Sequence, residues 1–183
     1  MRLFFAIEID EQTRAALVRA MTPVRPQAKN GRWTRPENLH VTVQFIGEVP
    51  DDSLDQLAII LRRAAGLVRP FSLVFREFGT FGPHADVLWI GIEPDAALQT
   101  LSGLIRSELA LAGLPCESRP FRPHLTIARQ VQPMSGRLPA WTLPPICCPV
   151  SRITLMESLR SDGVLRYRAV QRAELAGLPT IGS

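Results

Sequence analysis

The sequence predicts an α+β fold of two lobes related by an approximate twofold axis, with an active-site cleft between them. Each lobe is expected to be a small, mainly antiparallel sheet with outer helices. The prediction rests on a repeat at about half the chain length, on alternating strand-like and helix-like segments, and on a histidine motif in step with the repeat. With 183 residues, 46% of them hydrophobic, the chain suits a single domain, 1–183, containing two repeats at approximately 1–84 and 85–175.

Each repeat begins with a strand that leads into a helix. Residues 3–10 read LFFAIEID and residues 88–95 read LWIGIEPD, at an offset of 85 positions. Both runs are apolar enough for strands, and each ends at an aspartate, Asp10 or Asp95, which can cap a helix. Apolar residues then recur at helical spacing in two segments, residues 11–21 and 96–112.

The remaining segments extend the same alternation. We expect a further helix over residues 54–66, strands over 71–75 and 150–155, and a hairpin near the C-terminus whose turn is Asp162-Gly163. Residues 130–149 are rich in proline and show no clear period, so they are expected to form a connection with at most a short helical turn.

The pattern RPxxxHxT occurs twice, at residues 35–42 and 119–126, with an offset of 84 positions. Side chains at i and i+2 of a strand share a face, so His40 projects with Thr42 and His124 projects with Thr126. A single histidine on a strand is more often structural. Its recurrence with the same neighbours in a duplicated unit favours one shared site in the cleft.

Two histidines and two threonines suit metal-independent cleavage of a cyclic phosphate. With ordinary pKa values near 6.5, one imidazole can act as the base and the other as the acid at neutral pH. The hydroxyls of Thr42 and Thr126 can donate hydrogen bonds to the nonbridging phosphate oxygens. Neither histidine has the nearby carboxylate or second histidine of a usual metal site, so no metal is expected.

Composition narrows the class of protein further. The N-terminal apolar run ends at Glu8 and is too short for a signal sequence or a membrane span. Cys147 and Cys148 are adjacent and Cys116 has no obvious partner, so neither a disulfide framework nor a zinc site is indicated, and a cytoplasmic location is expected. The net charge of +4 suits an anionic partner, although a solvated basic surface would have the same charge.

The motifs HVTV at residue 40 and HLTI at residue 124 resemble the paired HxTx motifs of the two-histidine phosphoesterase superfamily. Four further stretches resemble its prokaryotic RNA 2′,3′-cyclic phosphodiesterases, historically called 2′-5′ RNA ligases: MRLFFAI, WTRPENLH, FIGE and RPFRPH. The resemblance implies hydrolysis of RNA 2′,3′-cyclic phosphate ends to 2′-phosphomonoesters without a cofactor. His40 would then be the proton donor and His124 the proton acceptor, a division of roles that the symmetry of the sequence alone does not assign.

The same resemblance implies the partners and a secondary activity. The partner would be RNA with 2′,3′-cyclic phosphate ends, tRNA halves among them, with no membrane and no obligate protein partner. Joining of such halves through a 2′-5′ linkage would be secondary to hydrolysis.

Several residues are candidates for substrate binding. Arg129 is the phosphate clamp that the family resemblance implies, although strand alternation places it opposite His124 unless the strand ends or bulges near Ala128. Phe45 shares a strand face with Val41 and Val43 by the same alternation, which favours core packing over stacking on a base. The remaining candidates are Trp33, Phe121, Arg119 and Tyr167, with Arg35 and Arg122 as further basic residues and His84 as a loop residue outside the repeat.

Three alternatives remain open on the sequence. One is a different substrate for the same chemistry, either a small cyclic nucleotide, such as ADP-ribose 1″,2″-cyclic phosphate, or a 2′-5′ oligoadenylate. The protein would be an RNA-end binding module without turnover if the histidines only recognised phosphate. A metallohydrolase would use the histidines as ligands and would be sensitive to chelators.

Overall fold

The computed structural model describes residues 1–82, 87–117, 119–133 and 142–177. The elements in chain order are β1 (Arg2–Glu8), α1 (Glu11–Met21), β2 (Ala28–Trp33), β3 (His40–Glu48), α2 (Leu54–Leu67), β4 (Phe71–Phe81), β5 (Val87–Ile92), α3 (Ala96–Leu111), β6 (His124–Pro133), β7 (Thr142–Val150), β8 (Arg152–Ser161) and β9 (Val164–Glu174). Short 3₁₀ turns precede three of them, at Arg25–Gln27, Pro36–Asn38 and Asp51–Ser53.

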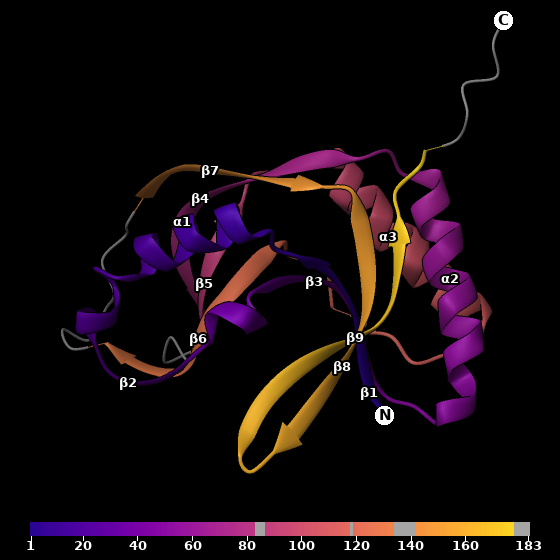
Figure 1. The fold of residues 1–183 in the computed structure, drawn as a ribbon, viewed down its shortest axis with the longest axis horizontal. Coiled ribbons are helices and arrows are strands. Elements are labelled where there is room, and N and C mark those ends of the chain that lie inside the picture. The colour runs from indigo at the N-terminus through magenta and orange to yellow at the C-terminus, as the bar shows by residue number, and fades with distance from the viewer. Residues whose placement is uncertain (83–86, 118, 134–141, 178–183) are drawn as a thin grey trace, which may run out of the picture.

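The strands form one curled antiparallel sheet in the order β7-β4-β5-β6-β3-β1-β8-β9, and β2 pairs additionally with β6 (Figure 1). The order is symmetric about the β6–β3 junction, with β5 and β1 at equivalent places on either side. The α+β class is therefore confirmed. However, β4 from the first half of the chain pairs with β5, and β8 from the second half pairs with β1. The two halves of the chain thus exchange their fourth strands, β4 and β8, and each side of the sheet contains strands from both halves.

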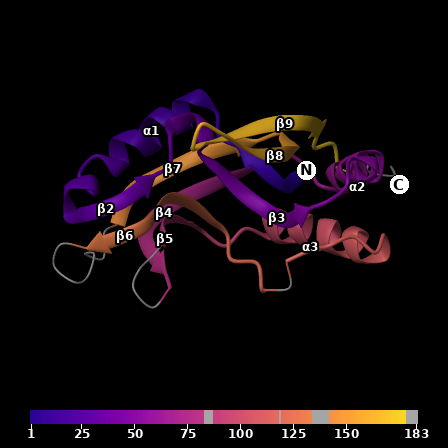
Figure 2. The ribbon, with the colours of Figure 1, turned by 90° about the horizontal axis from the view of Figure 1, so that it is seen from below.

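The helices are distributed over the sheet in the same crossed manner (Figure 2). Helix α1 packs on β7, α2 packs on β8 and β9, and α3 packs on β3 and α2. The two aspartates act as N-caps, because Asp10 accepts from Thr13 N at 2.9 Å and Asp95 accepts from Leu98 N at 2.7 Å. None of the described helices is long and apolar enough to cross a lipid bilayer.

The main core lies between the sheet and the helices. The side chains of Val41 in β3 and Leu125 in β6 are fully buried there, together with Leu98, Leu101 and Ile105 of α3. Burial of each such aliphatic side chain contributes about 1.5–3 kcal/mol to the free energy of unfolding. This packing fixes which face of β3 and β6 turns away from the helices.

The structure corrects the prediction made for the proline-rich segment. Within the described residues, 130–133 continue β6 and 142–149 belong to β7, so the expected connection over 130–149 is wrong. Strand β7 is the edge strand beyond β4, and an edge strand tolerates prolines because its outer amides need no partner. The C-terminal hairpin is confirmed, since Asp162 and Gly163 both have positive φ angles, 52° and 75°, as a type I′ turn requires.

Candidate active site

Both histidines of the repeated motif project from the same face of the sheet. Strands β3 and β6 pair antiparallel through Val41 and Leu125, and both of these side chains point into the main core. His40, Thr42, His124 and Thr126 are their chain neighbours, so all four point to the opposite face, where they are half-buried. The register makes His40 diagonal to His124, and diagonal residues of a regular antiparallel pair lie about 7–8 Å apart.

Each imidazole is held by a backbone carbonyl two residues upstream. His40 Nδ1 lies 2.7 Å from the Asn38 oxygen, and His124 Nδ1 lies 2.6 Å from the Arg122 oxygen. A carbonyl oxygen only accepts, so Nδ1 donates at both sites and carries the proton. The Nε2 atoms are therefore the nitrogens left to exchange protons, and His40 Nε2 lies 3.1 Å from Thr42 Oγ1.

Asn38 supports His40 in a way that sequence reasoning missed. Its side chain is 8% exposed, and Nδ2 donates to the Leu165 oxygen of β9 at 2.9 Å. The residue whose backbone oxygen accepts the hydrogen bond from His40 Nδ1 is thus tied to a strand on the far side of β1. The only available signal was its position two residues before the histidine, which Arg122 also occupies in the second motif.

Replacing Asn38 by alanine is expected to lower kcat by up to about 100-fold, because a small displacement of His40 is costly, and to lower the free energy of unfolding by about 1–3 kcal/mol. The backbone carbonyl of residue 38 raises the pKa of this imidazole. Loss of the side-chain anchor to Leu165 should weaken that hydrogen bond, so the pH limb that reports His40 should move to lower pH. Asn30→Ala is the matched control, because Asn30 donates to Gln132 at an exposed position. An unchanged pH profile and kcat in the Asn38 variant would show a merely structural residue.

Two β-bulges at equivalent positions determine which other residues share the histidine face. In β3, Thr42 pairs with Ala6 and Gln44 with Phe5, so Val43 is an extra residue. In β6, Thr126 pairs with Trp89 and Ala128 with Leu88, so Ile127 is an extra residue. Each bulge shifts the alternation by one position. As a result, Phe45 and Arg129 lie on the same face as the histidines.

These bulges decide two of the open sequence predictions. Arg129 is exposed on the histidine face, as the bulge alternative near Ala128 required. The prediction that Phe45 packs in the core with Val41 and Val43 is wrong, because it assumed regular strand alternation across the bulge at Val43. Phe45 instead packs with Phe4, Ala6 and Met156 on the histidine face, and the Arg2 guanidinium lies 5.2 Å from the centre of its ring.

Aromatic rings flank both histidines. The Tyr167 ring of β9 meets the His40 ring edge-on, with 4.7 Å between ring centres, and Phe4 lies 5.0 Å from the same imidazole. On the other side, Phe81 meets His124 edge-on at 4.9 Å and contacts Trp89 at 5.1 Å. Of these four aromatic residues, the sequence analysis predicted only Tyr167 as part of the site. Phe4 and Trp89 occupy the same position of the repeat, which was the available signal for both.

Burial and a nearby guanidinium lower the pKa of both imidazoles. The pKa of His40 falls from 6.5 to about 4, mainly through burial; the Asn38 carbonyl opposes this shift, and the Arg129 and His124 charges add to it. The pKa of His124 is also lowered, again mainly by burial and then by Arg129, with the Arg122 carbonyl opposing. In the ligand-free protein both imidazoles are therefore neutral near pH 7, and a bound anion would favour their protonation.

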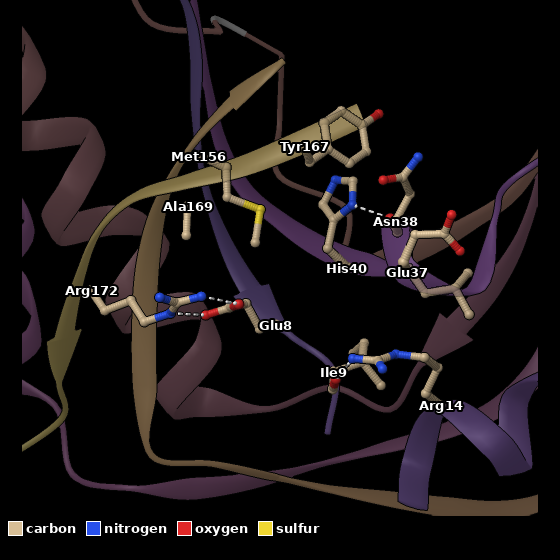
Figure 3. A pocket seen from close by; sticks show the side chains of 11 residues that line it. Glu8, Ile9, Arg14, Glu37, Asn38, His40, Met156, Tyr167, Ala169 and Arg172 are labelled. Carbon is tan, nitrogen blue, oxygen red and sulfur yellow. Dashed lines mark hydrogen bonds and ion pairs between the residues drawn. The ribbon is translucent and has the colours of Figure 1, made fainter. Parts of the chain in front are cut away.

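A pocket of about 120 Å³ adjoins His40 on the side of β9 (Figure 3). Arg172 binds both oxygens of Glu8, at 2.7 and 2.9 Å, and Thr154 donates to the same carboxylate at 2.7 Å. These contacts, with the hydrogen bond from Arg172 as the largest, hold the pKa of Glu8 below its ordinary value despite its burial. The pocket is lined by Glu8, Ile9, Arg14, Glu37, Asn38, Leu39, His40, Met156, Tyr167, Ala169 and Arg172.

The other sequence candidates make their contacts elsewhere. Trp33 and Phe121 pack partly against the main core, and the Arg25 guanidinium lies 5.2 Å from the Trp33 ring centre. Arg119 is exposed and forms an ion pair with Glu117 at 2.7 Å, and Arg35 pairs with Glu37 at 3.9 Å. His84 lies outside the described residues.

Comparison with known proteins places this arrangement in a family. The chain matches the 2′-5′ RNA ligase superfamily over residues 11–162. It is 32% identical to a Thermus thermophilus protein named RNA 2′,3′-cyclic phosphodiesterase, over 97% of this chain and 91% of that protein. It is 31% identical to the Escherichia coli protein of the same name, over 93% of this chain and 94% of that one.

Solved structures agree with the sequence comparison. The crystal structure of TT0787 of Thermus thermophilus matches with a TM-score of 0.85 at 30% identity, covering 97% of this chain and 99% of that chain. Escherichia coli LigT complexed with 3′-AMP matches with a TM-score of 0.80 at 29% identity, covering 95% and 97%. The match over most of the chain, together with the paired histidine motifs, shows that this protein belongs to the 2′-5′ RNA ligase superfamily.

Proposed function

We propose that the protein hydrolyses RNA 2′,3′-cyclic phosphate ends to 2′-phosphomonoesters, with His40 and His124 as its acid–base pair. The observation that carries the proposal is the matched orientation of the two rings. Both donate Nδ1–H to a backbone carbonyl and keep Nε2 for proton transfer, on one face of the sheet. The names of the relatives support the choice of substrate.

The reaction needs one proton taken and one proton given on opposite sides of phosphorus. Water attacks phosphorus in line with the bond to the ribose 3′ oxygen, and His124 Nε2 accepts the water proton. As that bond breaks, protonated His40 donates its Nε2 proton to the departing 3′ oxygen, which leaves a 2′-phosphomonoester. These roles follow the family resemblance, and the anionic substrate supports them by raising the depressed pKa of His40 on binding.

The other residues of this face suit the charge of the phosphate. Thr42 Oγ1 lies beside His40 Nε2, and we assign it and the equivalent Thr126 to the nonbridging oxygens. Arg129 offers a planar fork of donors to the same group. Phe45 and Tyr167 offer rings on which a base can stack, whereas the contacts of Trp33, Phe121 and Arg119 give those three no part in the proposal.

The proposed setting in the cell is cytoplasmic processing of RNA ends, tRNA halves among them. Ligation would use the same pair of proton transfers in the same direction, with a ribose hydroxyl as the attacking group in place of water and the ribose 3′ oxygen again as the leaving group. This secondary activity would use the same site.

The proposal is tested by the product formed from an oligonucleotide with a 2′,3′-cyclic phosphate end. We expect a 2′-phosphomonoester, identified by ³¹P NMR, formed at the same rate in the presence of EDTA. A 3′-phosphomonoester would contradict the assigned geometry, and loss of turnover with EDTA would favour a metallohydrolase. Binding without turnover would favour an RNA-end binding module. ADP-ribose 1″,2″-cyclic phosphate and 2′-5′ oligoadenylate, assayed alongside, test the small-molecule alternatives.

A further inference from the structure

The β8–β9 hairpin and the start of β1 place two arginines on the histidine face. In the sheet, Phe4 pairs with Met156, so Arg2 shares their face, because it is two residues before Phe4 on an unbulged strand. On the hairpin, Ser158 pairs with Tyr167, and Arg160, two residues after Ser158, pairs with Leu165. Arg2 and Arg160 therefore lie on the face from which the Tyr167 ring reaches His40.

The hairpin extends this face away from the body of the protein (Figure 1). It is hydrogen-bonded from Arg152 paired with Glu174 to Ser161 paired with Val164 at its tip. An RNA strand that ended between the histidines would have this surface available for the nucleotide before the end.

The positive charge on this surface is not neutralised within the described part of the chain. Arg2, Arg129 and Arg160 all lie near enough to Tyr167 to favour its phenolate, although burial outweighs them and raises its pKa. Among the described residues, no ion pair joins any of these three to a carboxylate. Unpaired guanidinium groups around an aromatic ring are a typical surface for a nucleic-acid strand.

Two carboxylates of these strands are bound by other arginines, whereas Glu48 of β3 lies opposite Arg2 in the sheet register and forms no ion pair with it among the described residues. Glu157 is buried on the opposite face of the hairpin, where it binds the Arg168 guanidinium. Glu8 is bound by Arg172 at the other end of the sheet face. Neither carboxylate is placed to repel a phosphate that approaches Tyr167.

The three arginines divide into two positions. Arg129 lies on the histidine face of β6 and its charge lowers the pKa of both histidines, so it would be next to a phosphate held between them. Arg2 and Arg160 belong to the strands around Tyr167, and the Arg2 guanidinium stacks over Phe45. Arginines on different strands of one face, with the rings of Phe45 and Tyr167 beside them, offer donors for more than one phosphate and a ring for a base.

We propose that Arg2 and Arg160 form a subsite for the internucleotide phosphate immediately before the cyclic end, so that the enzyme prefers an oligonucleotide to a cyclic mononucleotide. The inference rests on the proposed function and names the part of the substrate that extends beyond the reacting group. In this proposal Arg129 binds the cyclic phosphate itself, and the hairpin binds the part of the RNA that precedes it.

The test compares kcat/KM for a nucleoside 2′,3′-cyclic phosphate with that for a dinucleotide ending in the same cyclic nucleotide. We expect a preference for the dinucleotide of about tenfold or more, since a charge-assisted hydrogen bond contributes about 1.5–3 kcal/mol. A dinucleotide with a neutral methylphosphonate linkage should lose this preference. Added salt should also reduce it.

Arg2→Gln and Arg160→Gln should each reduce the ratio of the two kcat/KM values about tenfold. Arg166→Gln is the matched control, because Arg166 pairs with Leu159 on the opposite face of the same hairpin and should leave the ratio unchanged. Thermal unfolding verifies that each variant is folded, and Arg2→Lys tests Arg2 with the charge kept.

The outcomes separate the two proposals. Equal kcat/KM for the two substrates, an undiminished preference for the methylphosphonate, or an equal loss in the Arg166 variant would each overturn the subsite. Absence of turnover on both substrates would instead overturn the proposed function. In that case, calorimetric binding of the 2′-phosphorylated mononucleotide and dinucleotide gives the same comparison without catalysis, and equal affinities would overturn the subsite as well.

Discussion

Replacing either His40 or His124 by alanine is expected to lower kcat by about 10²–10⁴-fold, the usual contribution of a general acid or base. Each imidazole exposes only Nε2 for proton transfer, because Nδ1 is committed to a backbone carbonyl. Thr42 does not replace the lost group, since an alcohol is a far weaker acid and base at neutral pH than an imidazole. The rate is measured on an oligonucleotide with a 2′,3′-cyclic phosphate end.

The double variant distinguishes a shared site from two independent ones. If His40 and His124 act on one phosphorus centre, removing both should cost about as much as removing one, because either loss stops the coupled proton transfers. If the fold losses in kcat of the two single variants multiplied in the double variant, the two histidines would contribute independently. Circular dichroism and thermal unfolding serve as the control for folding, with the Gln variants as closer substitutes in size. Preserved turnover in a folded single variant would contradict the acid–base assignment.

The pair of histidines was predictable because it depends only on local rules. Duplication repeated the motif, and strand alternation then placed His40 with Thr42 and His124 with Thr126 on one face. The buried pairing of Val41 with Leu125 realises this arrangement. No knowledge of the strand order was needed for that step, since each motif carries its own alternation.

Strand alternation stops predicting the side-chain faces directly after Thr42 and Thr126, because the bulges there are not encoded in the local sequence. The bulges at Val43 and Ile127 arise where β3 and β6 pair with β1 and β5. No glycine or proline marks either position. The bulges determine the faces of Phe45 and Arg129, so these two orientations required the sheet itself.

The exchange of β4 and β8 between the two halves of the chain could not be predicted from local rules either. Residues 71–75 and 150–155 were predicted as strands, and most of each lies in β4 or β8. Their partners are strands from the opposite half of the chain, a choice made by tertiary packing. Tyr167 reaches His40 through the same packing, because β9 follows β8 beside β1.

Replacing Arg129 by glutamine is expected to lower kcat/KM by about 10²–10³-fold, the usual cost of losing a donor to the transition-state charge, and to move its pH profile upward. In the ligand-free protein the Arg129 charge lowers the pKa of both histidines. Removing that charge raises both pKa values. The acidic limb reports the base and the basic limb reports the acid, so both limbs should move to higher pH.

Arg129→Lys is the control that separates charge from geometry. Lysine keeps the positive charge near the imidazoles, so the limbs should stay where the wild type has them, below the ordinary histidine pKa of 6.5. It replaces a planar fork by a point charge, so the rate should still fall. Unshifted limbs in the glutamine variant would place the Arg129 charge away from the histidines. Full activity in that variant would leave Arg129 as a surface residue and remove the clamp from the mechanism, because the two imidazoles and the two hydroxyls would then suffice to bind the phosphate.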